Sequence, residues 1–324
     1  MPSSPLRLIA DIGGTHTRFA LVRAGSTQLE AQRTLQTRTY ASLGEAGRVY
    51  LHETRARPDE ACLAVAGPID GDTVRLTNHS WEFSQRALAN ELGVERLRVI
   101  NDFEAIALAL PHLDASVLLP IGGGTARTGH PLALLGPGTG LGVAQLVPTP
   151  GGFQAIPTEG GHASIGPADR DELSIITSLL DAGEHVSRET LLSGPGLERI
   201  HRALCSLRTC KPQALPAAEI QTRAVAGDDL LCRDALEIFC AFLGTAAADQ
   251  ALCCGALGGV YIAGGIVPRF TTFLQHSRFR ARFETNGPMS AYLRAIPVHV
   301  IMHHDPGLLG AAVANIDPTK ENMP

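Results

Sequence analysis

The sequence predicts an α/β fold in two domains, on three observations. The chain has 324 residues, whereas one domain usually has about 100 to 200. Short apolar runs typical of buried strands alternate with segments whose apolar residues recur every three or four positions, the spacing of one helix face. After Pro111 the pattern restarts with a glycine-rich segment and a new strand. We therefore place a domain boundary near residue 111.

The expected strands and helices follow one another along the whole chain. Strands are predicted at residues 6–11, 17–22, 61–67, 97–100, 132–135, 259–263 and 298–302. Helices are predicted from about residue 84 to a stop at Gly93, and over residues 103–110, 173–180, 197–204 and about 230–257. A last helix should follow Asp305, with Asp305 as its cap and Pro306 in its first position.

Composition and charge exclude several classes of protein. Hydrophobic residues make up 44% and charged residues 18%, as in an ordinary globular chain. The formal net charge of −5 provides no basic surface for nucleic acid, and no apolar run approaches membrane-spanning length. The N-terminal residues lack the pattern of a signal peptide. We therefore expect a cytoplasmic protein with neither nucleic acid nor membrane as a partner.

The seven cysteines indicate reduced thiols. They are odd in number, scattered, and mostly within apolar helical stretches, where a thiol acts as a small hydrophobic group. Cys253 and Cys254 are adjacent, but vicinal cysteines point in different directions from a helix and no C-x-x-C partner exists. Burial of both in a helix is therefore preferred to a metal site.

Three glycine-rich turns each follow an apolar strand, at Asp11–Thr15, Gly138–Gly142 and Ala263–Gly265. Backbone N–H groups in such turns approach a ligand closely and together form a concavity for phosphate oxygens. One such turn is weak evidence, but three in one chain indicate a nucleotide site. Asp11 ends a buried strand beside the first glycines, where a carboxylate can hold hydrated Mg²⁺ against nucleotide phosphates.

The chain lacks residues that other nucleotide-binding motifs require. The chain has only two lysines, Lys211 and Lys320, and neither lies in a glycine-rich loop. A Walker A loop and a protein-kinase site both require such a lysine. The segment Asp11–Thr17 also fails to place glycines at the first, third and sixth positions of a Rossmann motif. A nucleotide site in this chain must therefore work without a lysine.

Polar residues at strand and helix ends suggest a sugar as the acceptor. They lie in the segments Asn78–Ser80, Asn101–Asp102 and Glu159–His162, whose carboxylates, amides and imidazoles can pair with hydroxyls that both donate and accept. Asp102 is the candidate general base, which would take the hydroxyl proton during attack on the γ-phosphorus, a contribution of roughly 10²- to 10⁴-fold. The alternative role of Asp102 is a helix N-cap.

These segments resemble those of a known family. The run A-D-I-G-G-T-H-T-R-F-A-L-V resembles the first phosphate loop of the hexokinase and actin-like superfamily. From residue 6 to about 313, further motifs resemble the bacterial glucokinase family in order and spacing. They are T-N-H-S-W-E-F, I-N-D-F-E-A-I, G-P-G-T-G-L-G-V-A, T-E-G-G-H, L-L-S-G-P-G-L, V-Y-I-A-G-G-I-V-P-R-F and D-P-G-L-L-G-A-A.

The resemblance implies a fold and an activity. The fold would be a two-domain actin-like ATPase (ribonuclease H-like) fold with an interdomain cleft, with residues 1–111 and 301–324 in a small domain and 112–300 in a large one. The chain would be an ATP-dependent hexose kinase that transfers the γ-phosphoryl group of ATP to the 6-hydroxyl of D-glucose with Mg²⁺. The family further suggests a homodimer.

The site residues of the family carry over onto matching positions. Those expected at the ATP phosphates are Ala10, Asp11, Ile12, Gly13, Gly14 and Thr15, and then Gly138, Thr139 and Gly140. Those expected near the adenosine are Ala263, Gly264 and Gly265. Glucose would be bound by Asn78, Asn101, Asp102, Glu159, His162 and Glu189. Asp102 would activate the 6-hydroxyl. Glu189 is selected only because it stands just before the motif L-L-S-G-P-G-L.

The chain departs from the family pattern at two positions. His16 replaces the usual asparagine, and Pro137 stands where a small residue is common. Neither change removes a proposed catalytic group. No cysteine-rich motif follows His162, so we expect no structural zinc. His303 and His304 are interpreted as strand-end histidines.

Two other functions are compatible with the same scaffold. A sugar-responsive transcription regulator would need DNA-binding helices, for which a first strand at residue 6 leaves no room. An actin-like ATPase would use the same nucleotide loops, but the E-G-G-H segment and the N-D pair favour a small polar acceptor. Mannose, glucosamine and fructose stay open as acceptors beside glucose, as does polyphosphate beside ATP as donor.

Overall fold

The computed structural model describes residues 4–77, 79–209 and 214–316. Contacts between residues divide the chain into two compact units, each with its own sheet and core. The first unit comprises Met1–Leu113, Thr149–Pro157 and His303–Pro324. The second comprises Asp114–Pro148 and Thr158–Met302.

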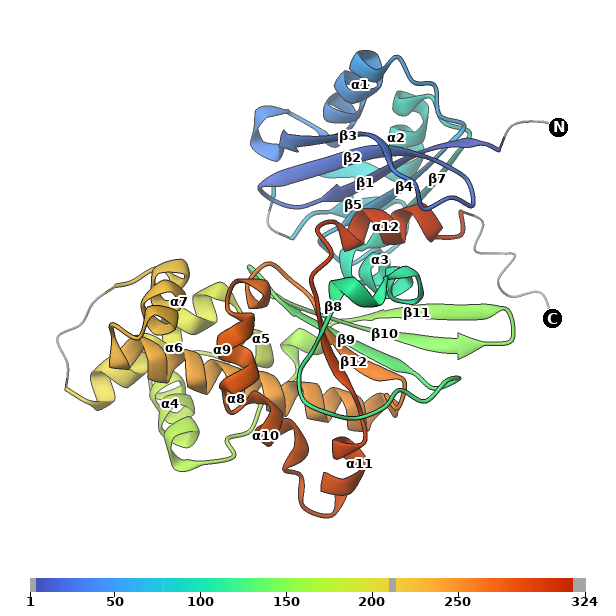
Figure 1. The fold of residues 1–324 in the computed structure, drawn as a ribbon. Coiled ribbons are helices and arrows are strands. Elements are labelled where there is room, and N and C mark those ends of the chain that lie inside the picture. The colour runs from blue at the N-terminus through green and yellow to red at the C-terminus, as the bar shows by residue number, and fades with distance from the viewer. Residues whose placement is uncertain (1–3, 78, 210–213, 317–324) are drawn as a thin grey trace. The chain divides into compact units, whose positions relative to one another are not determined.

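The first unit contains a five-stranded sheet of order β3-β2-β1-β4-β7 (Figure 1). Its strands are β1 (Leu6–Ile12), β2 (His16–Arg23), β3 (Glu30–Gln36), β4 (Glu60–Val65) and β7 (Arg96–Asn101). Strands β1, β2 and β3 form an antiparallel meander, whereas β1, β4 and β7 are parallel. Every residue of β4 is buried, as expected of a central parallel strand with both faces covered.

Helices cover both faces of this sheet (Figure 1). They are α1 (Leu43–Thr54), α2 (Gln85–Leu92), α3 (Asp102–Ala109) and α12 (Pro306–Val313). Alternate residues of β1 point to opposite faces, so Leu8 packs in the core with α1 and α2, and Ile9 packs in the core with α3 and α12. A small sheet of β5 (Thr73–Arg75) and β6 (Glu82–Ser84) completes the unit.

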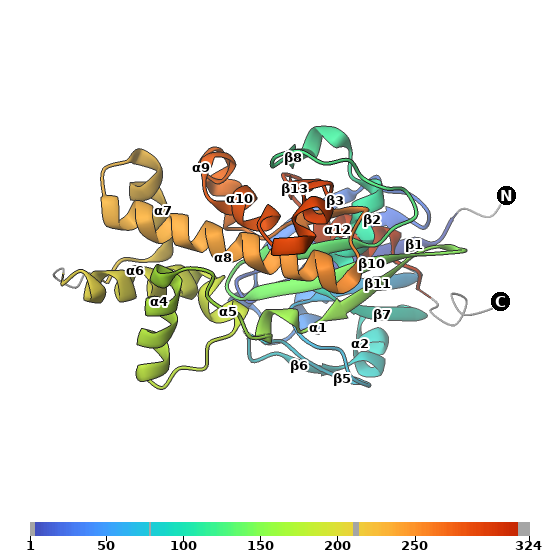
Figure 2. The same cartoon turned by 90° about the horizontal axis from the view of Figure 1, so that it is seen from below.

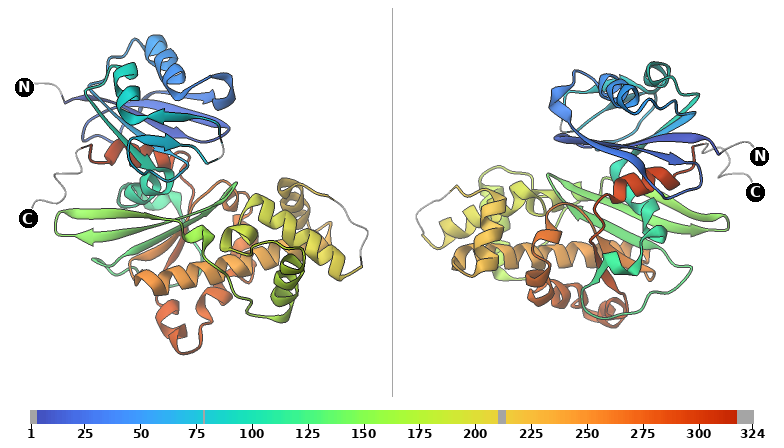
Figure 3. Two further views of the ribbon diagram at one scale, coloured as in Figure 1. Left: turned by 180° about the vertical axis from the view of Figure 1, so that it is seen from behind. Right: turned by 45° about the horizontal axis from the view of Figure 1, so that its top comes forward.

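Helix α12 comes from the end of the chain and packs directly on α3 (Figure 3). The helices meet at Gly310, where an added Cβ would lie 1.7 Å from the carbonyl oxygen of Ala105. No side chain fits in that space. A glycine is therefore required at position 310.

A six-stranded sheet of order β11-β10-β9-β12-β13-β8 has five of its strands in the second unit, and its edge strand β11 falls in the first unit except for Thr158. Its strands are β8 (Leu118–Pro120), β9 (Leu132–Pro137), β10 (Leu141–Thr149), β11 (Gly152–Thr158), β12 (Gly259–Ile262) and β13 (Val298–Ile301). Strands β9, β12 and β13 are parallel, and β10 pairs antiparallel with β9.

The helices of the second unit are α4 (Arg170–Asp181), α5 (Arg188–Leu191), α6 (Gly194–Leu207), α7 (Ala217–Ala226), α8 (Leu230–Cys254), α9 (Thr271–His276), α10 (Phe279–Glu284) and α11 (Ser290–Arg294). Helix α8 has 25 residues and is buried along most of its length. It contacts α6, α7 and α10, as Figure 2 shows. The side chains of Phe239, Phe242 and Leu243 on α8 are fully buried in this core.

Short 3-10 turns connect these elements. They are η1 (Thr37–Thr39), η2 (Leu110–His112), η3 (Ala115–Val117), η4 (Gly160–His162), η5 (Val267–Arg269) and η6 (Gly287–Met289). Among the described residues, no helix is long and apolar enough to cross a membrane.

The predicted strands and helices are confirmed, with shifts of a few residues at their ends. Helix α2 begins after Ser84, whose side chain accepts a hydrogen bond from the Ala87 N–H, and ends at Gly93 in a left-handed conformation. Helix α8 ends at Cys254 rather than near residue 257, because Gly255 also adopts a left-handed conformation. These helices thus begin and end at the capping residues of the sequence.

Two local predictions are wrong. Asp305 occupies the N-cap position of α12, but its side chain caps no backbone group of that helix. Its carboxylate lies instead against the guanidinium of Arg18 and accepts a hydrogen bond from the side-chain amide of Gln32. A contact between opposite charges is stronger than one between neutral groups. Cys253 is exposed, although Cys254 is half-buried. Within the described part of the chain, no cluster of three or more residues has the makings of a metal site.

We predict that Gly310→Ala lowers the free energy of unfolding by about 1–3 kcal/mol, because the added methyl group forces α12 away from α3. Alanine has the higher helix propensity by about 1 kcal/mol, so a net loss isolates the steric contact. Urea denaturation measures the change. The control is Gly166→Ala, where an added Cβ meets nothing within 4 Å. An unchanged midpoint for Gly310→Ala would contradict the close packing of α12 and α3.

Candidate active site

The first glycine turn joins β1 to β2 and is held in shape by Thr37. Gly13 N–H donates to the carbonyl of His16 at 3.0 Å, which closes the turn. The Thr37 hydroxyl donates to the carbonyl of Gly13 at 2.8 Å, and Thr37 N–H donates to the carbonyl of Thr15 at 3.0 Å. The turn therefore has a defined conformation that its own neighbours maintain.

Strand register brings this turn and the Asn101–Asp102 pair to the same edge of the sheet. Ile12 lies opposite Val65, and Val65 lies opposite Asn101. The carboxyl ends of β1, β4 and β7 are therefore level, and ligands of open α/β sheets bind beyond such ends. The structure thus places Asp102 near the first glycine turn within one unit.

The helix that follows Asn101 is capped by Asn101 and not by Asp102. The Asn101 amide oxygen accepts from the N–H groups of Phe103 and Glu104 at 2.9 and 3.2 Å, and its amide nitrogen donates to the carbonyl of Gly67 at 3.1 Å. Asp102 is the first residue of α3. Asp102 Oδ1 accepts from Phe103 N–H at 3.0 Å, but the N-cap position belongs to Asn101, so the N-cap alternative for Asp102 is wrong. Asn78 lies outside the described residues.

Asp11 shares Arg18 with a second carboxylate. Arg18 Nη1 lies 3.4 Å from Asp11 Oδ2, and Arg18 Nε lies 3.1 Å from Asp305 Oδ1. The first distance exceeds the roughly 2.7–2.9 Å of a strong charge-assisted hydrogen bond. Burial raises the pKa of Asp11, and the charge of Arg18 opposes that rise. A further cation beside Asp11 would thus be favourable.

A glycine of α12 borders the Asp11 carboxylate. Gly307 packs against its side chain, since an added Cβ at Gly307 would lie 3.0 Å from Asp11 Cγ. Carboxylate oxygens are the ligands that magnesium prefers. Asp11, at the entrance to the first glycine turn, therefore fits the position expected for a hydrated magnesium ion.

The second glycine turn joins β9 to β10 and is braced from both sides. Gly138 N–H donates to the carbonyl of Gly140 at 2.8 Å within the turn. From outside, Gly194 N–H donates to the carbonyl of Gly138 at 2.9 Å, and the Glu189 carboxylate accepts from Leu141 N–H at 2.8 Å. Thr139 at the tip is exposed. The turn therefore presents its tip to solvent from a fixed base.

The third glycine turn follows β12 and packs on the second. Ala263 N–H donates to the carbonyl of Leu135 at 2.8 Å. Gly264 has a φ of +86°, and an added Cβ would lie 2.3 Å from the carbonyl oxygen of Pro137. Both conditions require glycine. Pro137 therefore takes part in the contact between the two turns through its backbone.

The E-G-G-H segment packs on the start of β10. An added Cβ at Gly161 would lie 2.1 Å from the carbonyl oxygen of Leu141, so the turn approaches the backbone of β10 directly. Glu159 Oε2 and His162 Nε2 lie 3.9 Å apart, and 67% and 64% of their side chains are exposed. These two side chains therefore project together into solvent.

Glu189 lies at the start of α5, next to the second glycine turn. Ser187 and Thr190 form a capping box that fixes the beginning of this helix. Arg188 N–H donates to the carbonyl of Ala163 at 2.9 Å, which ties α5 to the segment after His162. Within the second unit, the structure thus brings together Glu159, His162, Glu189 and the two later glycine turns.

Several residues support these turns through contacts that the sequence did not predict. Thr37, Arg18 and Asp305 support the first turn, and Gly194 supports the second. One signal was present, because a hairpin closed at Gly13 places Arg18 directly opposite Asp11. Thr37, Asp305 and Gly194 come from distant parts of the chain and had no local signal.

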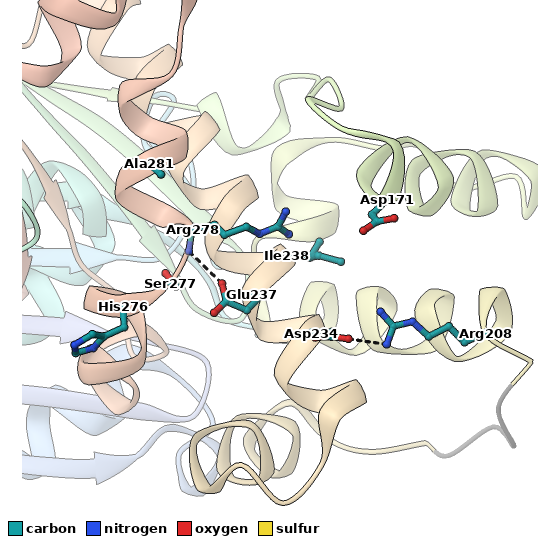
Figure 4. A pocket seen from close by; sticks show the side chains of 9 residues that line it. All are labelled: Asp171, Arg208, Asp234, Glu237, Ile238, His276, Ser277, Arg278 and Ala281. Atoms are coloured by element: carbon teal, nitrogen blue, oxygen red, sulfur yellow. Dashed lines mark hydrogen bonds and ion pairs between the residues drawn. The ribbon is translucent and has the colours of Figure 1, made fainter.

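A separate pocket in the second unit contains none of the predicted site residues (Figure 4). It has a volume of about 450 Å³ and is bordered by charged side chains from several helices. Arg208 pairs with Asp234 at 2.6 Å, and Arg278 pairs with Asp169 at 3.1 Å. Both cations of the pocket therefore have protein partners.

The chain is similar to known proteins over nearly its whole length. The family model described as Glucokinase matches residues 8–317. Glucokinase of Chromobacterium violaceum is 48% identical over 313 residues, which cover 96% of this chain and 90% of that protein. Glucokinase of Aromatoleum aromaticum is 47% identical, covering 95% of this chain and 94% of that protein.

Solved structures show the same similarity. A glucokinase from an Antarctic psychrotroph superposes with a TM-score of 0.86 at 39% identity, covering 95% of this chain and 98% of that chain. The fold is shared with a glucokinase from Balamuthia mandrillaris solved in complex with glucose, with a TM-score of 0.81 at 24% identity and 95% and 92% coverage. On the family match and these identities over nearly its whole length, the chain belongs to the glucokinase family.

Proposed function

We propose that the chain transfers the γ-phosphoryl group of ATP to the 6-hydroxyl of D-glucose, giving glucose 6-phosphate and ADP. One observation carries the proposal: the Glu189 carboxylate lies against the second glycine turn, beside the exposed Glu159 and His162. Groups suited to sugar hydroxyls thus adjoin backbone amides suited to phosphate. Relatives named glucokinase at 48% and 47% identity support the same reaction.

In this proposal Asp102 is the general base. Its carboxylate would accept the proton of the 6-hydroxyl as that oxygen attacks the γ-phosphorus. Asn101 would fix the direction of Asp102 because it caps α3 and bonds to Gly67. Glu159, His162, Glu189 and Asn78 would hold the other hydroxyls, so that the reacting oxygen is presented in one orientation.

The glycine turns would bind the nucleotide through their backbones. Gly13, Gly14 and Thr15 and then Gly138, Thr139 and Gly140 would meet the phosphates, with Ala10 and Ile12 supporting the first turn. Ala263, Gly264 and Gly265 would lie near the adenosine. A Streptomyces griseus glucokinase of the same fold was solved with glucose and AMPPNP, which supports ATP as the donor.

Asp11 is the residue that would hold magnesium. Its carboxylate lies at the first glycine turn. Its 3.4 Å contact with Arg18 is long, so the guanidinium only partly offsets the effect of burial, which raises the pKa of Asp11. A bound magnesium ion would neutralise charge on the nucleotide phosphates. The contribution of the chain would be to keep Asp11 ionised and directed at the turn, through Arg18 and Gly307.

Several further features belong to the proposal and rest on the resemblance to bacterial glucokinases. They are an actin-like (ribonuclease H-like) fold with an interdomain cleft, a small domain of residues 1–111 and 301–324, a large domain of residues 112–300, a cytoplasmic location and a homodimer. Closure of such a cleft would exclude water from the reaction and limit ATP hydrolysis.

The direct test is a panel of sugars with ATP and magnesium, in which ADP release and phosphorylated product are both measured. We expect glucose to give stoichiometric ADP and glucose 6-phosphate. ADP release that is independent of any sugar would instead favour an actin-like ATPase. Sugar binding without ADP release would favour a regulator.

We predict that Asp102→Asn lowers kcat by roughly 10²- to 10⁴-fold, because the amide cannot accept the hydroxyl proton. Glucose affinity, measured by calorimetry, should stay within a few fold of wild type. Glu95→Gln, an exposed carboxylate of the same unit, serves as the control and should leave kcat unchanged. A near-normal kcat for Asp102→Asn would remove Asp102 from the base role.

We also predict that Asp11→Asn raises the magnesium concentration required for half-maximal rate by about tenfold or more, because a charged oxygen ligand is lost. Binding of Mn²⁺ in the presence of AMPPNP, followed by electron paramagnetic resonance, should weaken in parallel. The matched control is Asp59→Asn in the same unit. Equal metal affinity in Asp11→Asn and wild type would show that Asp11 is not the magnesium residue.

A further inference from the structure

The Glu189 carboxylate is in direct contact with the second glycine turn. Its Oε2 atom accepts a hydrogen bond from Leu141 N–H at 2.8 Å, and Leu141 is the residue that follows the turn. An added Cβ at Gly140 would lie 2.4 Å from the same oxygen. Glycine at position 140 therefore allows the carboxylate to reach the backbone, and Glu189 is a partner of the turn.

The segment that carries Glu189 holds the turn at its other end as well. Gly194 N–H donates to the carbonyl of Gly138 at 2.9 Å. The Ser193 hydroxyl donates to the backbone carbonyl of Glu189 at 2.8 Å, which joins the two bracing residues. Residues 189–194 therefore hold the turn both where it begins, at Gly138, and where it ends, at Leu141.

This bracing segment has a firm base of its own. The capping box of Ser187 and Thr190 fixes the start of α5. The buried side chain of Arg188 contacts Asp249 on α8 at 3.3 Å. Since α8 is the central helix of this unit, the Arg188 contact ties the backbone next to Glu189 to the core. The contact between Glu189 and the turn is therefore supported by rigid neighbours.

We propose that Glu189 is a positioning residue for the second glycine turn and that it links sugar binding to nucleotide binding. Oε2 holds the turn through Leu141 N–H, while Oε1 is the oxygen with which the carboxylate meets a sugar hydroxyl. The second part rests on the proposed function, whereas the first does not depend on any sugar. A glutamate that only bound a sugar hydroxyl would not need to hold the second glycine turn through Leu141 N–H.

The linkage follows from the sharing of one group by two ligands. A sugar that binds Oε1 restricts the carboxylate to one orientation, and this orientation also holds Leu141 N–H. The turn is then ordered before the nucleotide arrives, so nucleotide binding loses less conformational entropy. Because coupling free energy is reciprocal, nucleotide must raise sugar affinity by the same factor.

The test is the affinity for AMPPNP, measured by calorimetry with magnesium and without sugar. Glu189→Ala removes the acceptor, and we expect binding to weaken about 3- to 10-fold, the effect of one lost hydrogen bond. Glu189→Gln keeps an oxygen that can accept from Leu141 N–H, and its affinity should return to within about twofold of wild type. Rescue by glutamine would not follow from a general loss of packing.

The matched control is Asp181→Ala, which removes an exposed carboxylate from α4 of the same unit. Without sugar it should bind AMPPNP as wild type does. When glucose is added, we expect AMPPNP affinity to rise in wild type and to rise by a smaller factor in Glu189→Ala. Equal enhancement in both proteins would overturn the linkage.

Wild-type affinity of Glu189→Ala for AMPPNP without sugar would overturn the positioning role. If wild type binds AMPPNP but phosphorylates no sugar, the proposed function fails while this result still stands. If Glu189→Ala does not fold, Gly140→Ala displaces the carboxylate without removing it. Faster amide exchange at Leu141 in Gly140→Ala is then expected, and unchanged exchange would contradict the proposal.

Discussion

The parallel pairing of strands is the constraint on which the arrangement of the candidate residues within each unit depends. In the first unit, β1, β4 and β7 end level with one another, so the first glycine turn and the Asn101–Asp102 pair share one edge. In the second unit, β9 and β12 run parallel, and the turns that follow them touch at Pro137 and Gly264. Parallel register therefore gathers residues that are far apart in the sequence.

Contacts without side chains determine how closely the turns approach one another. Gly264 packs on the carbonyl of Pro137, and Gly161 packs on the carbonyl of Leu141. At each of these places a methyl group would lie within 2.3 Å of a backbone oxygen. These two glycines therefore allow backbone to meet backbone.

Charge at the first turn is arranged around a single cation. Arg18 lies between Asp11 and Asp305, and Gln32 donates to Asp305 at 2.9 Å. Asp305 has the shorter contact with Arg18, but its buried Oδ1 atom has no hydrogen bond of good geometry. Asp11 has the longer contact with Arg18, and burial raises its pKa. The two carboxylates therefore share one guanidinium unequally.

Local sequence patterns predicted many of the strands and helices and the polar residues of the candidate site. Apolar runs and glycine stops located β1, β4, β7, α2 and α8, because these signals act over a few neighbouring residues. The motifs around Asp11, Asp102 and Glu159 carried their own polar groups, which made them visible without a structure. The prediction that the Asp305 side chain caps α12 was wrong, since an aspartate before a proline resembles a cap whatever its side chain contacts.

Which of these side chains and turns are in contact depends on the tertiary structure. The hydrogen bond from Leu141 to Glu189 joins residues 48 positions apart, and the support of the first turn by Thr37 and the pairing of Arg18 with Asp305 are likewise non-local. Such contacts depend on how strands and helices pack, and no local periodicity encodes them. The asparagine cap of α3 was settled in the same way, because the choice between Asn101 and Asp102 depended on the backbone geometry of one residue.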